Sequence, residues 1–192
     1  ALDGRGELSK VRRMVKRLAL STLAVLIAAV AALFGLALSK PDSYRVERDL
    51  EIAAPPSTIF DNLQDFRRWT KWSPWEQPDS DVKRTYTGPV SGTGARYAWD
   101  GKDIGSGEMT ITDSTPPHKL VIRLEFKKPL AETNEVTFEL KQLTAATRVR
   151  WSMTGPTRFA AKFLSVFIST EAFIGRDFEA GLTRLKKLCE GR

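Results

Sequence analysis

One feature of this chain constrains its fold more than any other: an uncharged stretch of twenty-one residues, Leu18–Leu38, with the sequence LALSTLAVLIAAVAALFGLAL. As an α-helix this stretch is about 31 Å long, and the hydrocarbon core of a bilayer is about 30 Å thick. The sequence therefore predicts one transmembrane helix. Everything after residue 38 then has to fold on one side of a membrane.

The distribution of charge predicts which side that is. Residues 1–40 carry seven of the 30 lysines and arginines and two of the 23 acidic residues, which accounts for +5 of the net charge of +7. Because basic flanks stay in the cytoplasm, residues 1–17 are predicted to form a basic cytoplasmic tail. The C-terminal part is predicted to lie on the exported side of the cytoplasmic membrane, periplasmic or extracellular. Its own net charge is only +2, so a nucleic-acid partner is not expected.

A cleaved signal peptide is the alternative interpretation of the apolar stretch. Ala37-Leu38-Ser39 resembles a small-residue cleavage site. Signal peptides have a shorter apolar region, of about 7–15 residues, which favours an uncleaved anchor. Cleavage stays open at this point.

Beyond a short linker, residues 39–43, the pattern of apolar residues has the period of two that is typical of β-strands. A first strand is predicted at 44–52, followed by two short helices, 58–63 and 66–69, with Asp65 as the N-cap of the second. Six further strands are predicted, at 82–87, 95–99, 107–112, 118–127, 135–143 and 147–154. Asp100-Gly101 predicts a hairpin turn, lengthened by residues 102–106.

From Arg158 the period becomes helical and continues to the C-terminus, with a bend expected near Ser169–Thr170. One strand, two short helices, six strands and a long amphipathic helix define an α+β domain over residues 44–190. A curved antiparallel sheet of about seven strands would bury its apolar face by wrapping around the long helix. An incompletely filled space between sheet and helix would be an apolar cavity.

Short motifs in this domain occur in a characteristic order: Ile52-Ala53-Ala54-Pro55, Ile59-Phe60-Asp61, Trp69-Thr70-Lys71-Trp72-Ser73-Pro74-Trp75, Tyr86-Thr87-Gly88, Gly105-Ser106-Gly107, Thr147-Arg148-Val149 and Asp177-Phe178-Glu179. This ordered set resembles the polyketide cyclase/dehydrase-type branch of the START-like (SRPBCC) superfamily. The resemblance implies a helix-grip fold with a hydrophobic cavity for lipids, sterols, polyketides or hormones. It does not imply one chemistry, because a fold alone does not fix a function.

The residue inventory argues against several kinds of active site. His118 is the only histidine and Cys189 the only cysteine, so Ser-His-Asp and Cys-His nucleophile systems and a zinc site are not expected. No dinucleotide or phosphate-loop motif is complete. We therefore assign no catalytic residue, no metal and no cofactor, and favour a non-enzymatic role. Acid–base chemistry by Asp, Glu, Tyr, Lys or Arg stays open.

The candidate ligand-binding residues are mainly aromatic. Three tryptophans fall within seven residues of one another, and the other rings lie on the apolar faces of predicted strands or of the final helix. An arginine on the apolar face of the first strand offers a partner for a carboxylate or phosphate. Core packing explains each ring, and an arginine can also extend out to solvent at a strand end. The set is Arg48, Trp69, Trp72, Trp75, Tyr97, Trp99, Phe126, Phe138, Trp151 and Phe178.

Three hypotheses follow from the sequence. The first is a membrane-anchored domain that binds a hydrophobic small molecule or a lipid in a cavity between sheet and helix. The second is a cyclase-like enzyme acting on a polyketide or a related hydrophobic substrate. The third is an envelope scaffold that binds a protein partner and takes up no ligand.

Overall fold

The computed structural model describes residues 4–76, 82–102, 104–157, 162 and 170–191. The chain divides into two units, one formed by residues 1–41 and 158–168 and the other by residues 42–157 and 169–192. The described secondary-structure elements are α1 (Gly4–Leu38), β1 (Ser43–Ile52), α2 (Pro56–Leu63), η1 (Phe66–Lys71), β2 (Lys83–Thr87), β3 (Arg96–Gly101), β4 (Gly105–Thr115), β5 (Lys119–Lys128), β6 (Glu132–Gln142), β7 (Thr147–Pro156) and α4 (Thr170–Cys189).

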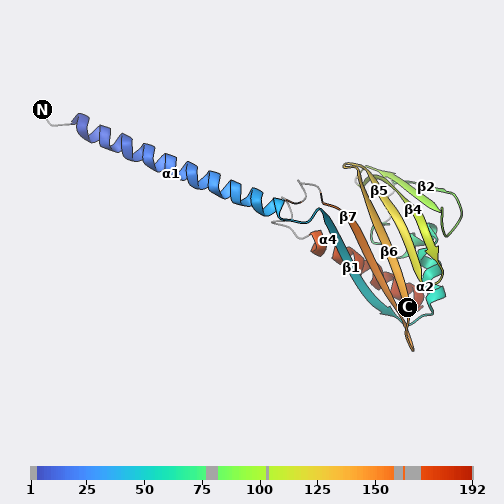
Figure 1. Cartoon of the computed structure of the whole chain (residues 1–192). Helices are drawn as coiled ribbons and strands as arrows, with labels where there is room; N and C mark the ends of the chain where they lie inside the picture. Colours follow the sequence, from blue (N-terminus) through green and yellow to red (C-terminus); the bar gives the residue numbers. More distant parts are fainter. Residues whose placement is uncertain (1–3, 77–81, 103, 158–161, 163–169, 192) are drawn as a thin grey trace. The chain divides into compact units, whose positions relative to one another are not determined.

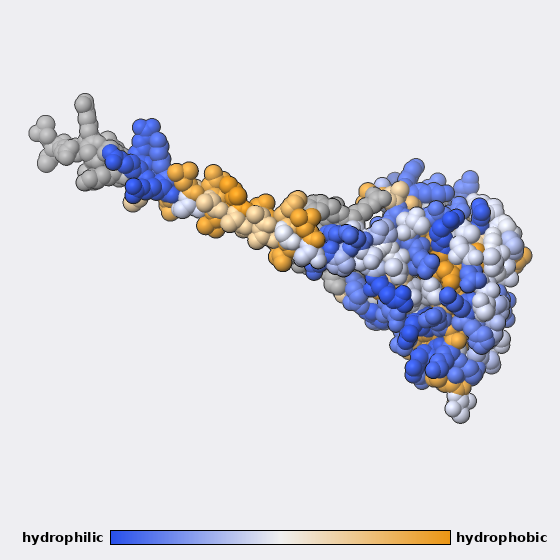
Figure 2. All heavy atoms as spheres, in the orientation of Figure 1, coloured by the Kyte–Doolittle hydropathy of each residue, from blue (hydrophilic) through white to orange (hydrophobic). Residues whose placement is uncertain are grey.

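The first unit contains α1, a single uninterrupted helix (Figure 1). Its part Arg12–Leu38 is long and apolar enough to cross a membrane, although a signal sequence meets the same criteria. Figure 2 shows hydrophobic residues along most of α1, with hydrophilic atoms at the N-terminal side. Two hydroxyl groups inside the apolar stretch, those of Ser21 and Thr22, donate hydrogen bonds to the carbonyl oxygen of Leu18. Such internal pairing suits a helix in lipid, where polar groups have no water to bind.

The second unit is built on a seven-stranded sheet in which all neighbouring strands are antiparallel. The strand order is β1-β7-β6-β5-β4-β3-β2. Alternation of buried and exposed residues explains why these segments form strands: in β6, Val136, Phe138 and Leu140 are buried, whereas Glu135 and Glu139 are exposed. The predicted strands are confirmed, with ends that move by a few residues.

The hairpin turn predicted at Asp100-Gly101 is wrong. Both residues belong to β3, and Gly101 pairs with Gly105 in β4, so the strands stay paired beyond the predicted turn. Gly105 has a φ of +70°. A left-handed glycine at the start of β4 lets the ladder stay paired up to Gly101, and this outweighs the Asp-Gly turn preference.

Helix α4 packs along one face of the sheet, behind β1 and β7 in Figure 1. Phe178 of α4 stacks on Trp151 of β7, with the ring centroids 4.1 Å apart. Further along α4, the Nζ atom of Lys186 donates a hydrogen bond to the carbonyl oxygen of Glu51, at 2.7 Å. The α+β helix-grip fold predicted from the sequence is thereby confirmed. The predicted helical residues 158–169, with their expected bend, lie outside the described helix.

The register defines two ends of the sheet that matter for the site. At the first, which we call the Ser43 end, Ser43 pairs with Pro156, and the turns β3–β4 (residues 102–104) and β5–β6 (residues 129–131) lie there. At the opposite Ile52 end, Ile52 pairs with Thr147 next to the β6–β7 turn. The N-terminal turn of α4 lies toward the Ser43 end, because Glu171 contacts Arg48 while Glu190 reaches the backbone of Ala53.

Candidate functional site

Five of the candidate rings form a closed cluster between the sheet and the helices. Their side chains are at most 2 % exposed: Trp69, Trp72, Phe138, Trp151 and Phe178. Phe138 and Trp151 lie opposite each other on β6 and β7 with ring centroids 4.9 Å apart, and Trp69 and Trp72 are 4.8 Å apart. The structure therefore places these five residues in the core, in contact with one another.

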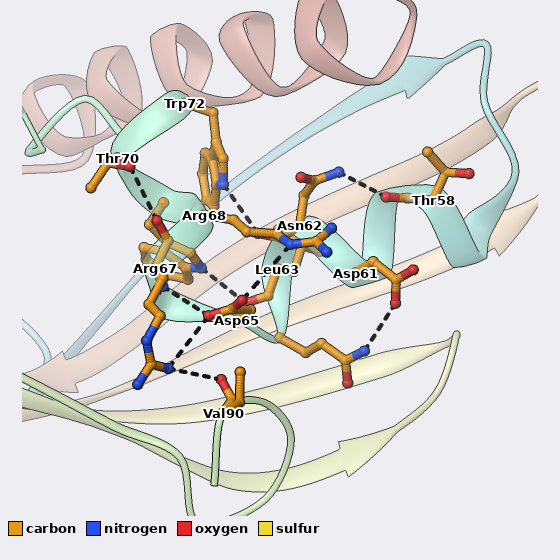
Figure 3. Close-up of polar contacts among 12 residues, drawn as sticks. Thr58, Asp61, Asn62, Leu63, Asp65, Arg67, Arg68, Thr70, Trp72 and Val90 are labelled. Atoms are coloured by element: carbon orange, nitrogen blue, oxygen red, sulfur yellow. Dashed lines mark hydrogen bonds and ion pairs between the residues drawn. The ribbon is translucent and has the colours of Figure 1, made fainter. Parts of the chain in front are cut away.

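Local hydrogen bonds fix Trp69 and Trp72 beside α2, and Figure 3 shows the bond that Trp72 makes. The carboxylate of Asp65 accepts a hydrogen bond from the backbone N–H of Arg67 and begins η1, which confirms the predicted N-cap. The indole N–H of Trp69 donates to the carbonyl oxygen of Leu63 at 2.9 Å, and that of Trp72 to the carbonyl oxygen of Asn62 at 3.2 Å. Buried indole donors are thus satisfied at the C-terminal end of α2.

The indole of Trp151 differs from those two. Its Nε1 atom is buried and has no hydrogen-bond partner within the described residues. An unpaired buried donor costs about 1–3 kcal/mol, so a ligand acceptor that reached it would remove this penalty.

Three other candidate rings are less buried than the closed cluster, and one of them, Trp75, packs on it. Trp75 is 46 % exposed and packs edge-on against Trp151 at 5.6 Å and against Phe178 at 6.1 Å between centroids. Phe126 is 36 % exposed and contacts the half-buried Trp99 edge-to-face at 5.9 Å. We call Trp75, Trp99 and Phe126 the open aromatic set.

A glycine in β4 makes room for part of this set. Gly107 pairs with Trp99 in β3 and with Phe126 in β5, and the Trp99 ring lies directly over its backbone. Any side chain at position 107 would displace that ring. The glycine therefore holds Trp99 flat on the inner face of the sheet, toward the Ser43 end.

A buried polar cluster adjoins the open aromatic set, and the sequence analysis missed it. The Glu76 side chain is only 6 % exposed and accepts a hydrogen bond from Nε of Arg84 at 2.9 Å. Arg84 pairs with Trp99 in the ladder, so both side chains lie on one face of the sheet. Tyr97 is a candidate ring two residues before Trp99 in β3. It is 3 % exposed and is the third member of the polar cluster.

The pKa shifts in this Glu76–Arg84–Tyr97 cluster have clear causes. Burial raises the pKa of Tyr97, and a hydrogen bond to the Glu76 carboxylate raises it further. The same carboxylate, through its hydrogen bond, raises the pKa of Arg84. At neutral pH the cluster therefore holds a protonated phenol beside a tightly paired arginine and glutamate. Tyr86 stacks on Tyr97 at 5.1 Å and extends the cluster along β2.

Arg48 is the one charged candidate, and the structure shows it bound to α4. Its Nε and Nη1 atoms lie 2.6 Å from the carboxylates of Glu179 and Glu171, respectively. The guanidinium crosses α4 over Gly175, where a side chain would collide with it. These hydrogen bonds raise the pKa of Arg48. The carboxylates that this arginine binds thus come from the protein itself.

Metal-ligand side chains and the cysteine complete the chemistry-bearing groups among the described residues. Within the described residues no group of three or more His, Cys, Asp and Glu side chains is arranged to hold a metal ion. Burial raises the pKa of the Cys189 thiol to about 11, and its Sγ atom accepts a hydrogen bond from the Asn62 amide at 3.7 Å. A thiol in this state is a packing residue and a poor nucleophile at neutral pH.

Comparison with known proteins identifies the family. The sequence profile of the family "Polyketide cyclase / dehydrase and lipid transport" matches residues 43–190, from the first residue of β1 to one residue beyond α4. The chain belongs to this family, and the predicted membership of the START-like superfamily is confirmed. A comparison with curated proteins finds no match.

Solved structures show the same fold at low sequence identity. The di-domain ARO/CYC BexL from the BE-7585A biosynthetic pathway has a TM-score of 0.59 and 20 % identity, over 99 % of this chain and 63 % of that one. The Aha1 dimer from Colwellia psychrerythraea has a TM-score of 0.55 and 17 % identity, over 77 % and 96 % of the two chains. DynU16, from the dynemicin biosynthetic locus, has a TM-score of 0.55 and 19 % identity, over 79 % and 48 %.

Proposed function

We propose that this protein is a membrane-anchored domain that binds a hydrophobic small molecule or a lipid on the inner face of its sheet, with Trp99 and Phe126 toward the Ser43 end and Trp75 beside Trp151. The observation that carries the proposal is the open aromatic set: Trp75 and Phe126 are exposed and Trp99 is half-buried, although Trp75 packs on the closed ring cluster and Trp99 lies beside Arg84 of the buried polar cluster. Exposed rings at the edge of a concave apolar face, with a few convergent polar groups, are typical of small-molecule sites.

The ligand's apolar part would contact the open aromatic set. Burial of apolar surface contributes about 25 cal/mol per Å², before the entropic costs of binding. Trp151, Phe138, Phe178, Trp69 and Trp72 form the wall behind these rings, and the unpaired indole N–H of Trp151 is a hydrogen-bond donor for a ligand oxygen.

The Glu76–Arg84–Tyr97 cluster indicates what kind of polar group the ligand carries. Arg84 and Glu76 neutralise each other at 2.9 Å, and Tyr97 stays protonated, so the cluster offers donors and acceptors without net charge. A neutral hydroxyl, ester or ketone group fits this surface better than a bare carboxylate, which would compete with Glu76 for Arg84. Arg48, already bound to Glu171 and Glu179, is assigned to clamping α4 on the sheet.

The membrane part of the proposal rests on the length and composition of α1. Residues 1–17 would be a cytoplasmic tail, 18–38 an uncleaved anchor and 39–43 a linker, with the family domain, 44–190, on the exported side of the cytoplasmic membrane. The apolar stretch from Arg12 to Leu38 and the basic residues before it support this arrangement. Lipids are the hydrophobic molecules most available to a domain held there.

A second candidate function is a cyclase-like enzyme, and one observation favours it. The protonated Tyr97 hydroxyl and the Glu76 carboxylate form a hydrogen-bonded donor–acceptor pair next to exposed rings. Such a pair can donate a proton to a developing enolate or alkoxide and accept one elsewhere on the same substrate. On this hypothesis Tyr97→Phe abolishes turnover and leaves substrate affinity nearly unchanged. On the binding hypothesis the same substitution lowers affinity modestly, and no product forms with either chain.

Photo-cross-linking of the full chain in lipid nanodiscs tests the proposal. A diazirine-bearing fatty alcohol and the matching fatty acid serve as probes, and labelled peptides are mapped by mass spectrometry. We expect saturable labelling near Trp75, Trp99 and Phe126, stronger with the alcohol and reduced by Trp99→Ala. Val90→Ala, an exposed apolar position outside the site, is the matched control and should leave labelling unchanged. Labelling confined to residues 18–38, unaffected by unlabelled competitor, would refute the binding site.

A further inference from the structure

Exposed apolar side chains gather at the Ser43 end of the sheet. Within the described part of the second unit, six large hydrophobic residues are clearly exposed, and four of them lie at this end. Ile104, 45 % exposed, is in the β3–β4 turn, and Leu130, 69 % exposed, is in the β5–β6 turn. Phe126 lies two residues before the end of β5, and Phe173, 68 % exposed, lies near the start of α4.

The two turns lie beside each other. Gly101 and Gly105 flank the β3–β4 turn, and Ser106 of β4 pairs with Lys128, which precedes the β5–β6 turn. The two exposed aliphatic side chains therefore project from neighbouring hairpin tips. At the opposite end, the β6–β7 turn carries Thr144 and Ala145 as its exposed residues, and the β2–β3 loop exposes one large apolar residue, Val90. The excess of exposed apolar residues at the Ser43 end is what a surface that contacts lipid at that end would show.

Lysines accompany these apolar tips. Lys102 precedes Ile104 by two residues, and Lys127 and Lys128 precede Leu130; all three are exposed. Lys127 makes one surface ion pair, at 3.4 Å, with Glu108. An apolar tip flanked by long basic side chains suits the boundary between acyl chains and phosphate headgroups, where lysines extend toward the phosphates.

Chain connectivity keeps this end within reach of a bilayer that holds α1. Four residues, 39–42, separate the end of α1 from Ser43, and fully extended they cover about 18 Å at most. The ten residues of β1 then extend about 33 Å toward the Ile52 end.

We propose that the β3–β4 and β5–β6 hairpin tips, with Ile104 and Leu130 at their ends, dock into the headgroup region of the bilayer that holds α1. The inference rests on the proposed anchoring and deepens the proposed function. Docking turns Phe126 and Trp99 toward the lipid, since both lie toward the same end of the sheet. A hydrophobic ligand then passes between bilayer and binding site without crossing water.

Depth-dependent fluorescence quenching of the full chain tests the docking. The chain carries Cys189→Ser and one new cysteine, labelled with the fluorophore NBD, and is placed in nanodiscs of phosphatidylcholine with and without phosphatidylglycerol. The labelled sites are Leu130→Cys, Ile104→Cys, Ala28→Cys in the span and Ala145→Cys in the β6–β7 turn. Lipids with a doxyl quencher near the headgroup or deep in the acyl chain report the depth of each label.

We expect the labels at 104 and 130 to shift to the blue and to be quenched by the shallow doxyl lipid. The label at 145 should stay unquenched, and that at 28 should be quenched by the deep doxyl lipid. Labels at 104 and 130 that match the one at 145, while position 28 is quenched, would overturn the docking but keep the anchor. A blue shift at 104 and 130 without quenching would mean that protein covers the tips, which also overturns it. An unquenched label at 28 would overturn the anchoring itself.

Discussion

Replacing Gly181 by alanine tests how tightly α4 packs on the sheet. In an exposed helix this change adds about 1 kcal/mol of stability, because glycine is a poor helix former. Here a Cβ atom at position 181 would lie 2.8 Å from Cζ3 of Trp151 and 3.1 Å from Cδ of Pro74. Trp151 cannot move away easily, since it stacks on Phe178 at 4.1 Å and packs against Phe138 at 4.9 Å. Overpacking of this kind costs about 1–3 kcal/mol.

The two effects together predict that Gly181→Ala destabilises the domain by about 0–2 kcal/mol, although helix propensity alone predicts a gain. The sign should reverse in a Trp151→Phe background, because the smaller ring lacks the atom that the new methyl group meets. Urea denaturation of the full chain in a non-ionic detergent measures both differences. All five tryptophans lie after residue 41, so their fluorescence reports on the second unit alone. A stabilising Gly181→Ala in the wild-type background would refute this packing.

Three further outcomes are expected. Asp65→Ala removes the N-cap of η1 and should cost about 1 kcal/mol in the same urea assay, whereas Asp65→Asn should keep most of the stability. Cys189, with a pKa of about 11 instead of 9.0, should react with a disulfide reagent at pH 8 about 100-fold more slowly in the folded than in the unfolded chain; equal rates would contradict its burial. The third outcome concerns pH: the pKa of Tyr44 is raised to about 12, chiefly by burial. Since these two groups, and Tyr97 with its raised pKa, release protons first in the unfolded chain, stability should be complete below about pH 9 and fall as pH rises above that. Tyr44→Phe should flatten the upper part of that fall, and an unchanged pH profile would contradict the assignment.

Much of the fold was predictable because it depends on local patterns. The alternation of Val136, Phe138 and Leu140 identifies a half-buried strand, and Asp65 identifies a helix start, without any tertiary contact. The β3–β4 turn was misplaced because its position depends on the backbone conformation of Gly105, which the strong Asp-Gly signal concealed.

The site was less predictable because its polar part is assembled by tertiary contacts. Glu76 lies in a loop, and its pairing with Arg84 depends on where that loop meets β2. One signal was present: in the strand Lys83–Thr87, Arg84 and Tyr86 alternate with exposed residues, which places them on the inner face. The sequence also contained a signal for the carboxylates around Arg48, since Glu171, Gly175 and Glu179 are spaced four residues apart on one helical face.

The fate of the aromatic candidates shows the same distinction. The alternation of side chains along a strand identifies which rings point inward, but not which of those rings become fully buried. Phe138 is sealed because Trp151 and Trp72 pack against it, whereas Phe126 on the neighbouring strand stays 36 % exposed near the end of the sheet. Ligand contact is therefore proposed for the open set, Trp75, Trp99 and Phe126, with the sealed rings as the wall behind it.

Native mass spectrometry of the full chain, extracted from cell membranes in a mild detergent, tests the central claim most directly. The account predicts one tightly held hydrophobic molecule per chain, neutral or zwitterionic, that survives detergent removal and is lost in Trp99→Ala but kept in Val90→Ala. Lipids bound loosely around α1 should be equal in both variants. A chain that carries no such molecule, and takes up none of the added fatty alcohol or phospholipid in saturable amounts, would contradict ligand binding and leave the protein-partner scaffold as the better account.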